Sequence, residues 1–232
     1  MKDNKLVSVI MSVYNDGDRV QKAIESILNQ SYSNFELLIT DDCSSDHTLR
    51  ICNKYSELDN VKVYRNNENI GLTKSLNKLI ELTKGDFIAR QDSDDISHKM
   101  RIEKQIEFMN NNNSCGISGT YAEIFGESEG IRKHSTDTNE LKIRSLFSCQ
   151  FCHPTVIIRK KIIEDQKINI SKEKLFYKNI LKIGYSEKNF KNSKIQKLKY
   201  LYSKILFHTF KISYLILNCQ VSPRCTISKA IS

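Results

Sequence analysis

Short apolar runs alternate with amphipathic stretches through the first half of the chain. Residues 7–13 and 35–40 are nearly continuous β-branched and aliphatic runs, which are typical of strands buried on both faces of a parallel sheet. Between them, residues 20–28 repeat apolar side chains at the i, i+3, i+4 spacing of a helix. Further strands are expected at 61–64 and 87–90. This alternation predicts an α/β fold with a mostly parallel sheet flanked by helices.

The remaining elements are less strongly marked. The pair Lys84-Gly85 is expected to end the third helix, because glycine favours the left-handed C-terminal position. A helix is predicted from Arg101 to Met109, and a polar loop from Gly126 to Thr138. We also expect strands near residues 116–117, 121–125 and 155–158, and helices at 48–55, 72–80, 141–147 and within 195–217.

The charge divides the chain unevenly. Residues 1–159 carry 20 Lys and Arg against 23 Asp and Glu, whereas residues 160–232 carry 16 against 4, so the net charge of +9 comes from the last third. Such a basic, helical tail is expected either to meet an anionic surface such as a membrane or to be a solvated end. Nucleic acid is not expected as a partner, since no recognition motif accompanies the charge. We predict three parts, 1–110, 111–165 and 166–232.

The cysteines indicate a reducing compartment. There are seven, an odd number at irregular spacing with no export signal before them, so we expect free thiols in the cytoplasm. Cys149-Gln150-Phe151-Cys152-His153 matches a haem-attachment pattern, and with His134 it offers zinc ligands. Neither group is expected, because haem attachment requires export and a zinc site requires a fourth, suitably spaced ligand.

An acidic cluster follows the fourth predicted strand. Asp92-Ser93-Asp94-Asp95 places carboxylates at a strand end, where they repel one another unless a cation lies between them. Mg²⁺ or Mn²⁺ bridging a diphosphate relieves that repulsion, although an acidic loop capping the next helix is the simpler alternative. The loops at 12–17 and 41–46 end other parallel strands, and ligands of such sheets bind at that edge. A dinucleotide oxidoreductase is disfavoured, because no Gly-x-Gly loop follows the first strand.

Taken together, these segments resemble the inverting glycosyltransferases of family 2, which have the Rossmann-like GT-A fold. The first strand and its loop read Val-Ser-Val-Ile-Met-Ser-Val-Tyr-Asn, and the strand before the acidic cluster reads Phe-Ile-Ala-Arg-Gln. The segments occur in the family's order over residues 6–110. The matching blocks are residues 7–15, 26–32, 35–48, 85–95 and 101–105, followed by the strand containing His153-Pro154-Thr155.

The resemblance implies a role for each matching residue. Asp42 would accept a hydrogen bond from the base, Asp92 would face the ribose, and Asp94, supported by Asp95, would bind Mg²⁺ or Mn²⁺ on the diphosphate. Cys43 departs from the family, which has glycine there, and a positive φ would strain it. The other residues implied to contact the donor are Ser12, Tyr14, Ser93 and Lys74, and His153 would line the acceptor side.

The activity implied is metal-dependent transfer of a sugar from a nucleotide-diphosphate donor, expected to be UDP-linked. The acceptor would be a glycan or a lipid-linked glycan in surface polysaccharide assembly, at the inner face of the plasma membrane. A carboxylate base is needed on the acceptor side, and the only candidates are Asp137, Glu164 and Asp165, none of which matches the family pattern.

We therefore expect the acceptor half to be truncated or replaced. Residues 219–228 resemble one coil of a hexapeptide-repeat protein, which is consistent with a fused reading frame. The alternative function is a degenerate protein that binds nucleotide-sugar without transferring it.

Overall fold

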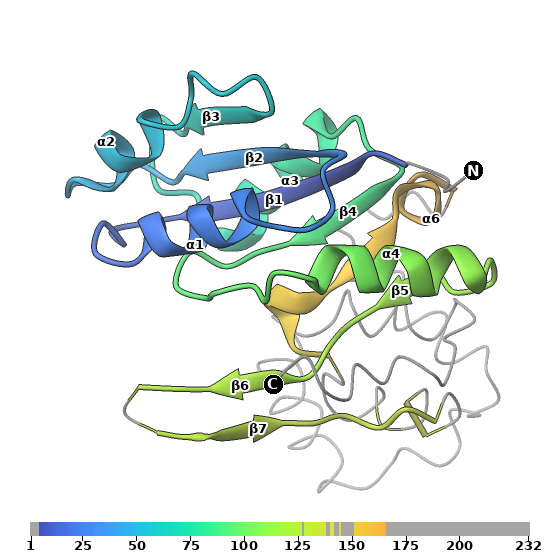
Figure 1. Cartoon of the computed structure of the whole chain (residues 1–232). Coiled ribbons are helices and arrows are strands. Elements are labelled where there is room, and N and C mark those ends of the chain that lie inside the picture. Colours follow the sequence, from blue (N-terminus) through green and yellow to red (C-terminus); the bar gives the residue numbers. More distant parts are fainter. Residues whose placement is uncertain (1–4, 127, 138–139, 142–143, 145–150, 166–232) are drawn as a thin grey trace, which may run out of the picture.

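A six-stranded sheet forms the centre of the computed structural model, which describes residues 5–126, 128–137, 140–141, 144 and 151–165 (Figure 1). The strand order is β3-β2-β1-β4-β8-β5. The strands of this sheet are β1 (Val7–Val13), β2 (Phe35–Asp41), β3 (Val61–Arg65), β4 (Phe87–Arg90), β5 (Ile117–Ser118) and β8 (Ile157–Arg159). The helices are α1 (Val20–Leu28), α2 (Thr48–Asn53), α3 (Leu72–Leu82), α4 (Arg101–Asn111) and α6 (Lys160–Asp165).

Strand β1 pairs in parallel with β2 on one side and β4 on the other, and β2 pairs in parallel with β3. Strand β8 is antiparallel to both β4 and β5. The mostly parallel α/β sheet flanked by helices is therefore confirmed. The chain adds β2 and β3 on one side of β1 and then crosses to place β4 on the other, so the strand order reverses between β1 and β4.

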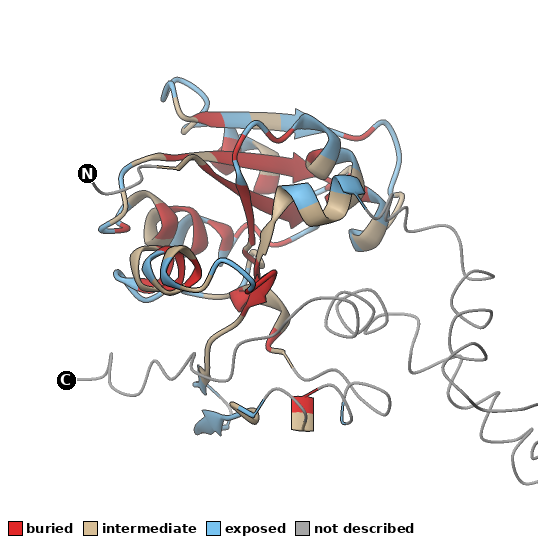
Figure 2. Ribbon diagram, turned by 90° about the vertical axis from the view of Figure 1, so that its right-hand side faces the viewer, coloured by how far each residue is buried: buried red, intermediate tan, exposed pale blue. Residues whose placement is uncertain are grey.

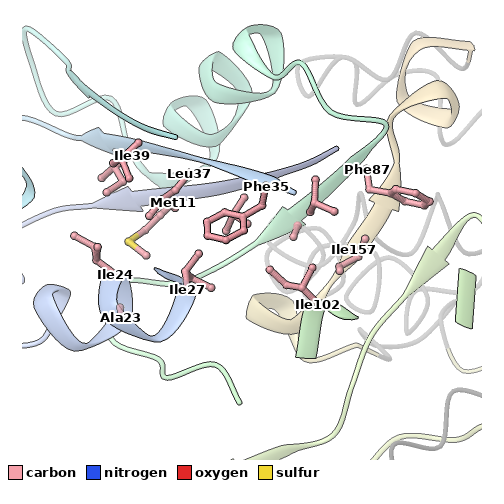
Figure 3. Packing of buried hydrophobic residues seen from close by; sticks show 14 of the residues in the cluster. Met11, Ala23, Ile24, Ile27, Phe35, Leu37, Ile39, Phe87, Ile102 and Ile157 are labelled. Atoms are coloured by element: carbon pink, nitrogen blue, oxygen red, sulfur yellow. The ribbon is translucent and has the colours of Figure 1, made fainter. Parts of the chain in front are cut away.

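Alternating side chains of β1 serve two separate cores. Val9 and Met11 face α1, α2 and α4, whereas Ile10 faces α3 and α6. The first core includes Met11, Ile24 and Ile27, which Figure 3 shows packed between the sheet and α1. Helices thus cover both faces, and β1 is buried along its whole length, as are most residues of β2 and β4 (Figure 2). This double burial explains why the strand sequences are nearly continuous apolar runs.

The second half departs from the sequence prediction in three places. A strand, β7 (Gly130–Arg132), lies within the predicted polar loop and pairs with β6 (Ala122–Ile124) as a hairpin. The segment predicted as a strand at 155–158 begins instead as a 3₁₀ turn, His153–Thr155, and becomes extended only at β8. Most of the predicted helix at 141–147, and the tail from 166 to 232, lie outside the described residues.

Gly85 has a different role from the one predicted. Helix α3 ends at Leu82, and Thr83 is already extended, so Gly85 does not provide a left-handed helix end. Its role is to let the chain pass close to the backbone of Leu6 and Ser8. A Cβ at Gly85 would lie 2.6 Å from the Leu6 carbonyl oxygen and 2.7 Å from the Ser8 nitrogen. The Gly85 N–H donates to Ser8 Oγ at 2.8 Å. Glycine thus lets the chain enter β4 directly against β1.

In the part of the chain that the structure describes, none of the helices has both the length and the apolar character needed to span a membrane.

Gly85→Ala should destabilise the fold by about 1–3 kcal/mol, because the added methyl group meets backbone atoms that cannot rotate away. Urea unfolding of the variant measures this change. Lys84→Ala, next to it with an exposed side chain, is the control and should change stability by less than about 0.5 kcal/mol. Equal stability of Gly85→Ala and the wild type would contradict the close-approach role.

Candidate functional site

Four loops meet at the carboxyl edge of the parallel strands, and hydrogen bonds join them. The Asn15 N–H donates to Ser44 Oγ at 3.0 Å, and the Asp16 N–H donates to Thr48 Oγ1 at 2.8 Å, which ties the loop after β1 to the loop after β2. Ser93 Oγ donates to Asp16 Oδ2 at 2.6 Å, which ties the loop after β4 to the loop after β1. This edge, at the reversal of strand order, is where ligands of such sheets bind.

Asp42 organises the loop that follows β3. Its carboxylate accepts hydrogen bonds from the backbone N–H groups of Ile70 (3.0 Å) and Gly71 (2.8 Å) and from the side chain of Asn66 (2.8 Å). Burial works to raise the pKa of Asp42, but these hydrogen bonds outweigh it and the pKa is lowered. Although Asp42 is only 2% exposed, these hydrogen bonds keep its carboxylate ionised, and through them it fixes the start of α3. The predicted contact with a base stays a prediction.

The remaining predicted donor contacts lie around this loop. Ser12 is buried near the end of β1, whereas Tyr14, two residues on, is 50% exposed. An exposed aromatic ring at a ligand-binding edge has a free face on which a planar base can pack. Lys74 is exposed in the first turn of α3.

Cys43 has a φ of 64°, in the left-handed region that favours glycine. The positive φ, which was the condition for strain at this cysteine, is therefore present. Asn15, across the same edge, also has a positive φ, of 48°, but its side chain compensates by accepting the Ser45 N–H at 2.8 Å. Asparagine tolerates this conformation better than cysteine, so the strain is concentrated at Cys43.

A buried glutamine shapes the acidic loop. The Gln91 side-chain amide donates to the carbonyl oxygens of Asp92 (3.0 Å) and Asp95 (2.7 Å), which closes the loop into a compact turn. Its own oxygen accepts from Ser97 at 2.6 Å. Gln91 is almost fully buried, so the loop has a fixed shape before any ligand arrives.

The three carboxylates of this loop have different surroundings. Arg90 binds both oxygens of Asp92, at 2.7 and 3.0 Å, so that charge is already neutralised. Asp94 is 48% exposed, and within the described part of the chain its carboxylate makes only a long contact, 3.5 Å, with Arg19. Asp95 is held between the other two, and burial, followed by repulsion from Asp92 and Asp94, raises its pKa to about 6. Of the three, Asp94 is the carboxylate that is open to a ligand.

Asp16 was not among the residues predicted from the sequence, where it reads as part of a turn. It is buried, and it accepts hydrogen bonds from Ser93 and from Arg19 Nε, both at 2.6 Å. Only the pairing of β1 beside β4 brings residues 77 positions apart into contact. A carboxylate in the loop that follows a buried strand, as Asp42 and Asp92 also are, was the available signal.

Arg101 connects the acidic loop to the acceptor-side segment. Its guanidinium is 5% exposed and donates to the carbonyl oxygens of Pro154 (3.0 Å) and Arg90 (3.3 Å). Burial lowers the pKa of Arg101 to about 10, although the charges of Asp95 and Asp92 oppose this, and the side chain remains cationic at neutral pH. The turn that begins at His153 is thereby held against the end of β4.

The described residues contain no group of three or more His, Cys, Asp or Glu side chains placed to enclose a metal ion. This arrangement still fits Mg²⁺ or Mn²⁺, because such ions often take one or two protein carboxylates and complete their shell with phosphate and water. Asp94 offers an open carboxylate for that purpose, whereas Asp92 is already paired with Arg90. The zinc ligands considered from the sequence include Cys149, which lies outside the described residues.

The acceptor-side candidates lie elsewhere. Strand β8 runs antiparallel to β4, so α6 follows at the amino end of β4 (Figure 1). Its carboxylates, Glu164 and Asp165, therefore lie at the opposite end of the strands from the acidic loop. Glu164 pairs with Lys160 at 3.6 Å. Asp137 lies in an exposed loop, where its carboxylate accepts the Glu140 N–H. The pairing of β8 with β4 places Glu164 and Asp165 away from the carboxyl edge, so these two are not included in the site, and the role predicted for Asp137 stays a prediction.

In the presence of a chelator, Asp95→Asn should stabilise the fold at pH 7.5 by about 1 kcal/mol, a figure reduced for partial solvent screening. A carboxyl group whose pKa is raised in the folded state costs nothing below its unfolded pKa of 3.8, and its cost is complete above the folded value of about 6. Urea unfolding at pH 4 and pH 7.5 therefore measures a larger gain at pH 7.5. The exposed Asp86→Asn is the control, and a gain independent of pH would count against the buried, repelled carboxyl group.

Comparison with known proteins places this arrangement in a family. Over 163 residues the chain is 39% identical to the putative glycosyltransferase EpsE of Bacillus subtilis, covering 68% of this chain and 58% of that protein. Over 161 residues it is 32% identical to the UDP-Glc:alpha-D-GlcNAc-diphosphoundecaprenol beta-1,3-glucosyltransferase WfgD of Escherichia coli, covering 69% and 63%. The chain thus spans less than two thirds of either relative.

A solved structure and a family model indicate the same family as these relatives. The crystal structure of S. aureus TarS 1-349 superimposes with a TM-score of 0.59 at 25% identity, covering 72% of this chain and 50% of that one. The model of glycosyl transferase family 2 matches residues 8–168, which include the acidic loop, Asp42 and the acceptor-side turn. The chain therefore belongs to glycosyl transferase family 2 and has its GT-A-like fold.

Proposed function

We propose that this chain binds a nucleotide-diphosphate sugar, UDP-linked, at the carboxyl edge between β1 and β4 and supplies the donor half of a sugar transfer. The observation that supports this most is the Asp16–Ser93 hydrogen bond, which fixes the half-exposed Asp94 beside the loop after β1. WfgD is named for a UDP-Glc donor, and TarS 1-349 has been solved in complex with UDP-GlcNAc. Residues 1–110 would form this donor-binding part.

Each side chain would then have a distinct task. Tyr14 would pack on the base, with Ser12 and Asp42 at its edge, and Asp92, with Ser93 beside it, would face the ribose. Asp94, supported by Asp95, would hold Mg²⁺ or Mn²⁺, which when bound neutralises charge on the departing diphosphate. Lys74 would approach the phosphates from the start of α3. The fixed shape given by Gln91 means that these groups need little rearrangement when the donor arrives.

The acceptor would be a glycan or a lipid-linked glycan in surface polysaccharide assembly. WfgD is named for a diphosphoundecaprenol-linked acceptor. His153 begins the turn that Arg101 holds against β4 through Pro154, so it would stand on the acceptor side of the same edge. The acceptor hydroxyl also needs a base to take its proton.

A second candidate function is binding of the nucleotide-sugar without transfer. The position of Glu164 and Asp165 favours it. These residues lie at the opposite end of β4 from Asp94, too far to act as a base on an acceptor hydroxyl beside Asp94. Donor binding together with release of free sugar or transfer to an acceptor would support the enzyme. Donor binding without either reaction, on undecaprenyl-linked or free glycans, would support the second function.

Asp94→Ala should abolish the Mn²⁺-dependent part of UDP binding, because it removes the open carboxylate that the ion would use. Calorimetric titration of UDP with Mn²⁺ and with EDTA measures this, and we expect at least a tenfold weaker affinity in Mn²⁺, equivalent to about 1.4 kcal/mol. Asp86→Ala, an exposed aspartate at the other end of β4, is the matched control and should bind as the wild type does. No binding of UDP, GDP or TDP sugars by the wild type would reject both functions.

The basic end of the chain would hold the protein peripherally at the inner face of the plasma membrane, where a lipid-linked acceptor is available. Residues 160–232 carry 16 Lys and Arg against 4 Asp and Glu. Removal of residues 166–232 should therefore release the protein from vesicles that contain anionic lipid, and raised salt should do the same to the full chain. Sedimentation with vesicles measures this, with neutral vesicles as the control. Unchanged binding after removal would reject the role of the tail.

A further inference from the structure

Arg19, the residue just before α1, is directed at the acidic loop by a buried carboxylate. Its Nε donates to Asp16 Oδ1 at 2.6 Å, and its Nη1 lies 3.5 Å from Asp94 Oδ2. Asp16 cannot move freely, because it accepts from Ser93 Oγ at 2.6 Å and its own N–H is bonded to Thr48. The Nε of Arg19 is therefore held in place, although the side chain as a whole is 62% exposed.

The three arginines around the acidic loop are used differently. Arg90 uses its Nε and Nη2 in a bidentate pair with Asp92, and Arg101 is buried against backbone carbonyl oxygens. Arg19 alone of these three presents its guanidinium to solvent beside Asp94, and its Nη2 makes no hydrogen bond within the described residues. Its charge is thus available to a ligand that enters next to Asp94.

The electrostatics of the edge call for such a group. Among the described residues, the carboxylates of Asp16, Asp92, Asp94 and Asp95 lie close to three guanidinium groups, so a diphosphate would enter a region that is already negative. A divalent ion on Asp94 would make the local charge positive. The ion would also bind the carboxylate that Arg19 now faces. The planar fork of arginine would then be free to bind phosphate oxygens on the same ion.

We infer that Arg19 binds the diphosphate of the donor and moves from Asp94 to the phosphate oxygens when the metal occupies Asp94. This rests on the proposed function, because the diphosphate is that of the nucleotide-sugar. Arg19 is then a binding residue for the leaving group, while Asp16 is the positioning residue that aims it. The sugar and the base do not contact it.

The test compares ligands with and without the diphosphate on Arg19→Gln. Calorimetry in Mn²⁺ should show UDP bound about tenfold more weakly than by the wild type, with uridine affinity unchanged, since a charge-assisted hydrogen bond is lost only to the phosphates. Arg19→Lys should recover part of the loss, because it restores the charge but not the fork. Lys22→Gln, an exposed change one turn along α1, is the control and should bind UDP as the wild type does.

Three results would overturn the inference. Wild-type affinity of Arg19→Gln for UDP would show that the guanidinium does not touch the phosphates. Tighter Mn²⁺ binding with no loss of UDP affinity would show that Arg19 is only a counter-ion of Asp94. Equal weakening of UDP and uridine, by Arg19→Gln and Arg19→Lys alike, would show a structural role. Failure of the wild type itself to bind UDP is a separate result, which would reject the proposed function as well.

Discussion

Strand β1 pairs in parallel with β2 and β4 at once, and this double pairing is the constraint on which the rest of the structure depends. It buries β1 on both faces and between two neighbours, which explains the nearly continuous apolar run from Val7 to Val13. It also sets the loops after β1 and β4 side by side, so that Ser93 reaches Asp16. Because the strand order reverses at β1, β4 is its direct neighbour, and the loops that carry Tyr14 and Asp94 are adjacent.

The same edge concentrates negative charge, and the fold balances it unevenly. Arg90 neutralises Asp92 through a bidentate pair, whereas Arg101 is buried and acts on Asp95 at a distance. Asp94 is left open, with Arg19 nearby. The three carboxylates thus range from fully paired to open. Such an arrangement suits a cation shared with a phosphate ligand, because most of the negative charge is balanced without the ion while one carboxylate remains available to it.

Antiparallel pairing of β8 separates the two halves of the site. The turn at His153 meets the acidic loop because Arg101 joins the Pro154 carbonyl oxygen to the end of β4. The chain then runs back along β4 and leaves the sheet at its amino end, where the Lys160 N–H bonds to Asp86. The turn proposed for the acceptor side is therefore built into the same sheet as the proposed donor site, whereas the carboxylates of α6 lie at the opposite end of β4.

Apolar periodicity and strand-end carboxylates are local signals, so the parallel part of the fold and the acidic loop could be predicted before the structure was known. The family resemblance also drew attention to Cys43, whose φ is positive in the structure. Which carboxylates are paired and which is open became evident only from the fold, as did the bond by which Asp16 joins two loops 77 residues apart. Those outcomes depend on which strands become neighbours and on how deeply each group is buried, and neither property belongs to any short stretch of sequence.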